Sequence, residues 1–302
     1  MKVLQQGNAL KTLMTAMATI LGGVGVMQSA QAATWSDTSI GWRYGTQFAE
    51  PYKNDADGSR TDITKQIFNL THASGDKYGS NFFNVDLLQS NDEPNSTQSN
   101  NKGTQEAYVV IRRYLDLGAI TKTNLSVPGY IRGAGLTAGL DWNTKNDSYS
   151  SKKRMWVVGP TIQFDVPGFL DFSILALFES NDPSSDTPRF GYSSGRYTYD
   201  THAAAQFTWG IPIAKTPLSF EGYALWIDSK GKNESGGDTK AETHIDARVM
   251  YDLSSVIGLK GSKLRAGAGY EYWKNKFGND TDGFAGKGAT ASTPMVRVDY
   301  HF

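Results

Sequence analysis

The chain has 302 residues, and its 30 Lys and Arg balance its 30 Asp and Glu. This neutrality leaves no basic footprint for nucleic acid, and the absence of cysteine excludes disulfides, Cys-ligated zinc and a thiol nucleophile. Hydrophobic residues make up 39% and charged residues 20%, which excludes a disordered chain and a bundle of membrane helices. The 7 Trp, 15 Tyr and 32 Gly are typical of a β-rich envelope protein.

The first 32 residues have the pattern of a secretory signal. Met1 and Lys2 begin a short, positively charged n-region that extends to Lys11. Residues 13–27 form an apolar stretch, and Ala30 and Ala32 provide a small-x-small cleavage site. This apolar stretch is shorter than the ~20 residues that a membrane-spanning helix needs. We therefore predict an exported protein that is cut after Ala32, with residues 33–302 as one domain.

The rest of the chain alternates between apolar and polar residues with a period of two. The last segment is the clearest case, because Val296, Val298 and Phe302 lie on one face while Arg297 and Asp299 lie on the other. A strand of a transmembrane barrel has this pattern, since one face meets lipid and the other a wet interior. Twelve such strands are predicted, at 37–49, 61–72, 77–89, 105–116, 129–142, 154–166, 169–180, 196–210, 217–229, 240–253, 262–275 and 291–302.

The connections between these segments alternate in length. Those after the odd-numbered strands are long and polar, and most of the others are short turns, although the turn at 117–128 is longer. Long loops on one rim, short turns on the other and an even strand count are typical of outer-membrane proteins. We therefore predict an all-β fold, a transmembrane antiparallel β-barrel of twelve strands in the cell outer membrane. Its long loops are extracellular, and its termini and short turns are periplasmic.

No catalytic or metal-binding motif emerges from the sequence. The GYSSG run at 191–195 lies in a polar loop rather than on a strand-to-helix turn, and the four histidines lack metal-ligand spacing. We therefore expect neither an enzyme nor a cofactor nor a metal. Two pairs keep a barrel hydrolase open as an alternative: Asp200 with His202, and His244 with Asp246, each on one face of a strand and each suited to a His–carboxylate dyad.

The inward face carries the most information about function. Charges of both signs are interspersed with aromatic rings, and a lumen of twelve strands is narrow once its side chains are placed. These features favour passage of a small, neutral, flat and polar solute. By parity, the inward side chains that we predict to contact the solute are Asp86, Arg113, Glu179, His202, Glu221, Tyr223, His244, Asp246, Arg248, Glu271 and Trp273, alongside Arg43, Arg265, Arg297 and Asp299.

Several aromatic-rich runs resemble the Tsx-type nucleoside-specific channel family of outer-membrane proteins. They occur in the family's order and span most of the mature chain: WRYGTQF at 42–48 with Glu50 and Pro51 after it, NFFNVD at 81–86, 106–114, LTAGLDWN at 136–143, MWVVG at 155–159, VPGF at 166–169, 207–213 and VDYHF at 298–302. The resemblance implies a monomeric barrel that passes nucleosides, with loops that phages or colicins use as receptors. Tyr44, Phe48 and Arg113 lie inside matching runs, so the resemblance implies that they belong to the solute path.

We therefore predict a substrate-selective channel for facilitated diffusion, with weak sites that do not trap the solute. Trp273 above Glu271, and Tyr223 near Glu221, are expected to stack a nucleobase while the carboxylate accepts a ribose hydroxyl. A second interpretation places Trp273 in the lipid-facing aromatic girdle. The alternatives to a channel are the hydrolase and a structural or adhesive barrel with a closed lumen.

The expected partners of the protein are nucleosides or similar solutes, outer-membrane lipids, and the barrel-assembly machinery that recognises the C-terminal strand. The two faces should also differ in tolerance. We expect an arginine at the outward Val249 to cost ~2–4 kcal/mol near the bilayer midplane. An arginine at the inward Asp246 is expected to cost much less.

Overall fold

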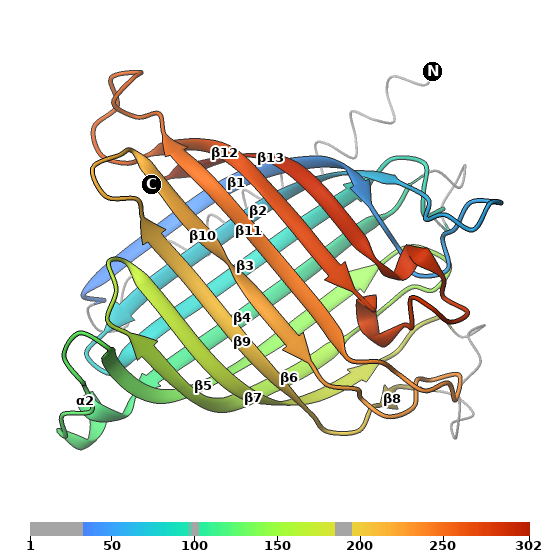
Figure 1. Cartoon of the computed structure of the whole chain (residues 1–302), viewed down its shortest axis with the longest axis horizontal. Coiled ribbons are helices and arrows are strands. Elements are labelled where there is room, and N and C mark those ends of the chain that lie inside the picture. The colour runs from blue at the N-terminus through green and yellow to red at the C-terminus, as the bar shows by residue number, and fades with distance from the viewer. Residues whose placement is uncertain (1–32, 96, 98–102, 185–194) are drawn as a thin grey trace.

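The computed structural model describes residues 33–95, 97, 103–184 and 195–302, and these form one closed antiparallel β-barrel (Figure 1). Each spanning strand pairs with its neighbours in sequence, and pairing between the first and last strands closes the ring. The predicted fold class is confirmed. The strands are β1 (Trp35–Phe48), β2 (Ile63–Asp76), β3 (Gly79–Ser90), β4 (Gln105–Asp116), β5 (Ile131–Lys145), β6 (Arg154–Phe164), β7 (Phe169–Asn181), β8 (Tyr197–Thr198), β9 (His202–Pro212), β10 (Leu218–Ile227), β11 (Glu242–Asp252), β12 (Leu264–Lys274) and β13 (Ala291–His301).

Twelve of these strands span the barrel. The two-residue β8 pairs with the end of β7, just beyond the part of β7 that pairs with β9. The predicted eighth strand, 196–210, is therefore interrupted between β8 and β9. The alternation over 197–209 predicts that Tyr197 and Tyr199 share the outward face of Phe207 and Trp209, and this prediction is wrong. Both rings are buried, because the Tyr199 hydroxyl donates to Glu234 at 2.8 Å and the Tyr197 hydroxyl donates to the Lys232 carbonyl at 2.9 Å.

The outer wall of the barrel is apolar, and the alternation along each strand produces it. In β13, Val296 and Val298 are 52% and 38% exposed, whereas Met295 and Arg297 between and beside them are 4% exposed. Val249 of β11 also lies on the outer face, as predicted. Apolar side chains are stable on this outer surface because it contacts lipid instead of water.

The inner wall contains more apolar residues than the charged positions in the sequence suggest. One buried cluster lies on β6, β7, β9 and β10, and a second lies on β1, β2 and β13, about half-way around the ring. Charged side chains are buried in the barrel as well, among them Glu179, Asp246 and Arg297. The first cluster consists of Met155, Val157, Leu175, Leu177, Ala204 and Ile227, and the second of Phe48, Ile63, Ile67 and Met295.

The two rims differ as predicted, with short turns and the C-terminus on one side and long loops on the other (Figure 1). The long turn at 117–128 contains the short helix α2 (Leu117–Thr121). Asp116 caps its start, since the Ala119 amide donates to the Asp116 side chain at 2.9 Å, and the left-handed Lys122 ends it. No helix among the described residues is long and apolar enough to cross a membrane. The predicted signal, residues 1–32, lies outside the described residues.

Candidate functional site: the barrel lumen

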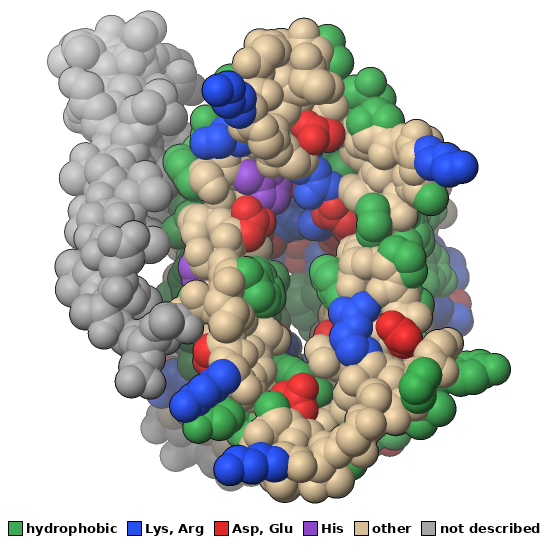
Figure 2. All heavy atoms as spheres, turned by 90° about the vertical axis from the view of Figure 1, so that its left-hand side faces the viewer, with side chains coloured by type: hydrophobic (Ala, Val, Ile, Leu, Met, Phe, Trp, Pro, Cys, Tyr) green, Lys and Arg blue, Asp and Glu red, His purple; other side chains and the backbone are tan. Residues whose placement is uncertain are grey.

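The turn-side rim of the barrel is hollowed in its middle, and acidic, basic and histidine side chains are visible inside the hollow (Figure 2). These groups come from strands that are distant in sequence but face one another across the lumen. They fall into five groups, which are described below from the turn side of the barrel toward the loop side.

Glu221 of β10 is the first centre of charge pairing. Two arginines from neighbouring strands bind it: the Arg248 Nε and Nη2 atoms lie 3.0 and 2.9 Å from its carboxylate, and Arg265 forms a closer ion pair. The Ser219 hydroxyl donates to the same carboxylate at 2.7 Å. Two guanidinium groups thus share one carboxylate. The Arg248 side chain is still 31% exposed.

Asp246 of β11 is the second centre, and it is 2% exposed. The Arg297 Nη2 atom of β13 lies 2.6 and 2.5 Å from its two oxygens, and the Arg43 Nη1 atom of β1 lies 3.8 Å away. Arg43 also forms a close ion pair with Asp86 of β3. These contacts link β1, β3, β11 and β13 across the seam that closes the barrel.

An aromatic group follows on β10, β11 and β12. The imidazole of His244 stacks on the indole of Trp273 with ring centroids 3.9 Å apart and planes 7° apart. Tyr223 contacts the imidazole edge-on at 5.0 Å, and Phe277 contacts the indole edge-on at 4.8 Å. We call Tyr223, His244, Trp273 and Phe277 the aromatic group. Because Trp273 pairs in register with His244 and faces inward with it, the girdle interpretation of Trp273 is wrong.

Polar atoms surround the aromatic group. The Trp273 indole nitrogen donates to Glu242 at 3.1 Å, and the Phe277 amide donates to the same carboxylate at 3.0 Å. The Glu271 carboxylate lies 3.7 Å from His244, and the Lys276 ammonium lies 4.9 Å from the centre of the Trp273 ring. Flat rings and carboxylates therefore meet within one part of the inner wall.

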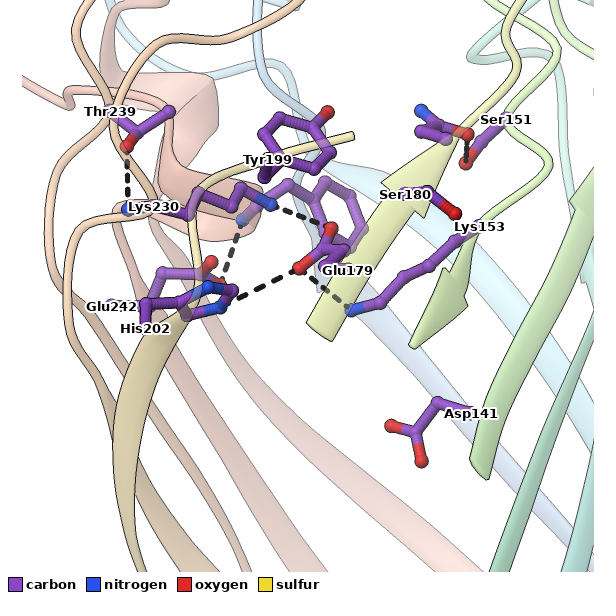
Figure 3. Close-up of polar contacts among 12 residues, drawn as sticks. Asp141, Ser151, Lys153, Glu179, Ser180, Tyr199, His202, Lys230, Thr239 and Glu242 are labelled. Atoms are coloured by element: carbon purple, nitrogen blue, oxygen red, sulfur yellow. Dashed lines mark hydrogen bonds and ion pairs between the residues drawn. The ribbon is translucent and has the colours of Figure 1, made fainter. Parts of the chain in front are cut away.

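Glu179 is the centre of a buried cluster nearer the loops (Figure 3). Lys230 Nζ lies 2.8 Å, Lys153 Nζ 3.7 Å and His202 Nε2 3.9 Å from its carboxylate oxygens. The lysines come from loop residues beside β10 and β6, and His202 is the first residue of β9. Lys230 also lies 4.3 Å from the centre of the Tyr199 ring. The strand ends on this side are therefore tied together inside the barrel.

Glu50 is a lumen residue that sequence reasoning missed. It follows β1, folds back into the lumen and is 5% exposed. The Nζ atoms of Lys65, Lys145 and Lys276 lie 2.5, 3.1 and 3.3 Å from its oxygens. Burial alone raises the pKa of Glu50, but the three lysines outweigh burial and hold it well below the ordinary 4.5. Lys65 and Lys145 have inward parity, which was the one available signal in the sequence.

Two of the predicted solute contacts do not face the lumen. Tyr44 is 38% exposed and stacks beside Trp42 on the outer face, because its neighbour Arg43 takes the inward position. Arg113 also points outward, and both of its Nη atoms bind Asp76 at the β2–β3 turn, at 2.7 and 3.0 Å. These two predictions are wrong.

The error at Arg113 has a simple origin in the sequence. Arg112 and Arg113 are adjacent, so polarity alone does not say which of them faces inward. The structure places Arg112 inside, 2.5 Å from Asp141. Phe48 does face inward, but it is 2% exposed and packs in the second apolar cluster beside Ile63.

Neither of the two candidate His–carboxylate dyads forms. His202 Nδ1 contacts the Asp200 backbone carbonyl at 2.9 Å, and its carboxylate neighbour is Glu179. His244 pairs with Glu271 instead of Asp246. Residues i and i+2 of a strand are about 6.8 Å apart, whereas cross-strand neighbours approach to about 5 Å, so pairing across strands prevails. Among the described residues, no group of three or more His, Asp or Glu is placed to hold a metal ion.

No protein family model matches the chain, and no curated protein matches it in sequence. Solved structures do match. The translocator domain of the autotransporter NalP from Neisseria meningitidis has a TM-score of 0.47 and 10% identity, over 96% of this chain and 98% of that one. The KdgM porin has a TM-score of 0.41 and 8% identity, over 87% and 99%. The β domain of the Bordetella autotransporter BrkA has a TM-score of 0.39 and 10% identity, over 88% and 98%.

Similarity at this level assigns neither a family nor a solute, so membership of the Tsx-type family stays a prediction. The barrel itself is decisive for the class of protein. A closed antiparallel ring of twelve spanning strands has an apolar outer wall, a charged interior, long loops on one rim and short turns on the other. This is the architecture of outer-membrane proteins, because a closed barrel leaves no backbone group unpaired in lipid. The protein is an outer-membrane β-barrel.

Proposed function

We propose that this barrel is a passive channel selective for small polar solutes with a flat ring, and that nucleosides are the favoured class. The observation that carries the proposal is the aromatic group with its adjacent carboxylates. Its His244–Trp273 stack has the spacing and parallel planes of two stacked aromatic rings. A planar ring therefore already occupies the face of Trp273 in the protein, and the imidazole marks where a nucleobase would lie.

The neighbouring groups suit the rest of a nucleoside. Glu271 and Glu242 both lie beside the Trp273 ring, and carboxylate oxygens accept hydrogen bonds from the hydroxyls of a ribose. Each site must be weak for the solute to leave. Competition from His244 for the face of Trp273 weakens binding in just this way. The buried Glu50 and Glu179 clusters narrow the loop-side end of the lumen, which suits a selective path rather than a wide pore.

Single-channel recording in a planar bilayer, with and without adenosine, tests the proposal. Trp273→Ala should weaken the adenosine block of ion current about five-fold or more, because stacking a base on an aromatic ring contributes ~1–3 kcal/mol. His244→Ala should strengthen the block, because it uncovers the ring face. Trp226→Ala is the matched control, since Trp226 lies on the outer face and is 46% exposed.

The same recordings separate this proposal from its rivals. A barrel without conductance would be the structural or adhesive alternative, and conductance that adenosine leaves unchanged in all variants would remove the nucleoside assignment. The hydrolase alternative requires turnover of lipid or peptide that depends on His202 or His244. Equal adenosine block in Trp273→Ala and Trp226→Ala would show that the aromatic group does not contact the solute.

A further inference from the structure

A small cavity opens on the loop-side rim, on the outer side of the wall and away from the lumen. Its volume is about 380 Å³. Tyr272 and Lys274 form its floor at the end of the outward row of β12, below the loop that connects β12 to β13. The lining residues are Arg60, Tyr272, Lys274, Thr281, Asp282, Lys287 and Thr290.

Three cations line this cavity, against a single carboxylate. Lys287 binds Asp282 with 2.8 Å between nitrogen and oxygen, and both side chains remain more than half exposed. Lys274 is exposed at the end of β12, forms no ion pair with another described residue, and acts electrostatically on the same Asp282. Two lysines thus share one carboxylate, which leaves the cavity with positive charge to spare.

Arg60 is held in place at the third side of the cavity. Its Nη1 and Nη2 atoms donate to the carbonyls of Thr290 and Ser292 at 3.4 and 3.3 Å, and its Nε donates to Asp62 at 3.0 Å. These contacts fix the guanidinium before any ligand arrives, so binding costs little side-chain entropy. Asp62 lies beside Arg60 but does not line the cavity.

The depth of the cavity identifies the kind of ligand. Along the outward row of β12, Ala268 is followed by Tyr270, Tyr272 and Lys274, a sequence that runs from lipid through the aromatic girdle to the headgroup level. Tyr270 is 47% exposed on this face. Because the loops are extracellular, this level belongs to the outer leaflet, which in an outer membrane is made of lipopolysaccharide. The anions at that depth are the phosphates of lipid A.

We propose that the cavity beside Lys274 binds a phosphate of lipid A. Arg60, Lys274 and Lys287 supply the charged donors, and Tyr272 packs against the sugar or the upper acyl chain. The site lies outside the lumen and is independent of the solute that the channel passes. It would anchor the end of β12 and the loop that connects β12 to β13 in the outer leaflet.

The experiment uses purified full-length protein in detergent and lipid A as the ligand. Native mass spectrometry measures the lipid bound by the wild type and by each variant. Lys274→Glu and Lys287→Glu should each weaken binding of diphosphorylated lipid A by at least about ten-fold, because each replaces a charge-assisted contact by repulsion. Fully dephosphorylated lipid A should bind the wild-type protein with a similarly reduced affinity. Lys77→Glu, an exposed lysine on the turn-side rim, is the matched control and should bind as the wild type does.

The heat-modifiable band on a gel, measured on the same samples, shows whether each variant is folded. Wild-type affinity in both Lys274→Glu and Lys287→Glu would overturn the proposal, as would equal binding of dephosphorylated lipid A. Inorganic phosphate serves as the competitor that separates a lipid site from a general anion site. If millimolar phosphate displaces lipid A completely, the lipid assignment is wrong, and if it does not, the acyl and sugar contacts are part of the site.

Discussion

Glu50 has an unusual position for a loop residue, since it lies inside the barrel among three lysines. Each of these lysines comes from a different part of the chain: Lys65 from β2, Lys145 from β5 and Lys276 from the β12–β13 loop. Glu50 is the carboxylate that all three ammonium groups contact. Lys145 has a second partner, Asp147, at 3.0 Å. A charge removed from such a buried group leaves its partners uncompensated.

We expect Glu50→Gln to lower the free energy of unfolding at pH 7 by about 3–5 kcal/mol, because three buried ammonium groups lose their shared carboxylate. The pKa of Glu50 is depressed below 4.5, so its contribution is fully present above that pH. The contribution is lost as the pH falls through the lower folded-state value. Urea unfolding followed by tryptophan fluorescence, from pH 8 down to pH 2, measures the difference between the two proteins.

Glu93→Gln is the matched control for this prediction. Glu93 pairs with Lys53 at 2.8 Å, but both side chains are 34% exposed, so its loss should cost at most ~1 kcal/mol. The stability difference between wild type and Glu50→Gln should be flat from pH 8 to 5 and shrink only at lower pH. A difference that disappears already between pH 6 and 5 would contradict the depressed pKa.

At the scale of the strand, the two faces impose different demands, but the inner face is not the tolerant one. Asp246 was expected to accept an arginine at little cost. The structure reverses that expectation, because Arg297 and Arg43 both converge on this carboxylate and it is 2% exposed. A third guanidinium at this position would repel the two already there.

We therefore predict that inner and outer substitutions are both costly, for different reasons. Val296→Arg, at the centre of the outer face of β13, should cost ~2–4 kcal/mol, since it places a charge in lipid. Asp246→Asn should cost about 3–5 kcal/mol, since it leaves Arg297 buried without its anion. Unfolding free energies of the two variants in phospholipid vesicles check both values.

A double variant tests whether the cost at Asp246 comes from its pairing with Arg297. Arg297→Gln combined with Asp246→Asn should recover part of the loss, because neither member of the pair is then an uncompensated charge. Arg43 keeps its other partner, Asp86, in all of these variants. A cost below ~1 kcal/mol for Asp246→Asn would mean that water reaches the pair and that the inner wall is more open than its contacts indicate.

At the scale of the whole molecule, the barrel depends on the seam between its first and last strands. β1 and β13 pair from Ser39 with His301 to Gly45 with Met295. Beyond β13, the Phe302 amide donates to the Thr38 carbonyl at 2.9 Å, and its ring meets Tyr300 edge-on at 5.6 Å. The last residue of the chain therefore extends the seam, and its exposed ring lies on the outer surface.

Deletion of Phe302 should reduce the amount of folded barrel in the outer membrane several-fold, because it removes the terminal aromatic ring that we propose the barrel-assembly machinery recognises. The heat-modifiable band on a gel, quantified from isolated outer membranes, measures the folded fraction. Phe302→Tyr keeps a ring at this position and should restore the yield. Equal yields of wild type and the deletion would show that the seam closes without this residue.

The alternation of side chains predicted the strands, most of their faces and the two rims. Lipid on one side and packed charge on the other force a period of two on each strand, and that period is visible in the chain. β4 has the predicted bounds, 105–116, and the other spanning strands lie within a few residues of theirs, except that β9 begins only at His202 instead of residue 196. Where polarity was ambiguous, as at Arg112 and Arg113, only neighbouring strands decided which side chain faces inward.

The choice of partners was decided by the tertiary structure alone. Asp246 and Arg297 are 51 residues apart in sequence, and Glu50 meets Lys276 across 226 residues. No local pattern encodes such pairs, because they depend on the order of strands around the ring and on their stagger. The sequence by itself determined that this chain forms a membrane barrel with a charged interior. Which charges neutralise one another, and which rings stack, followed from closing the ring.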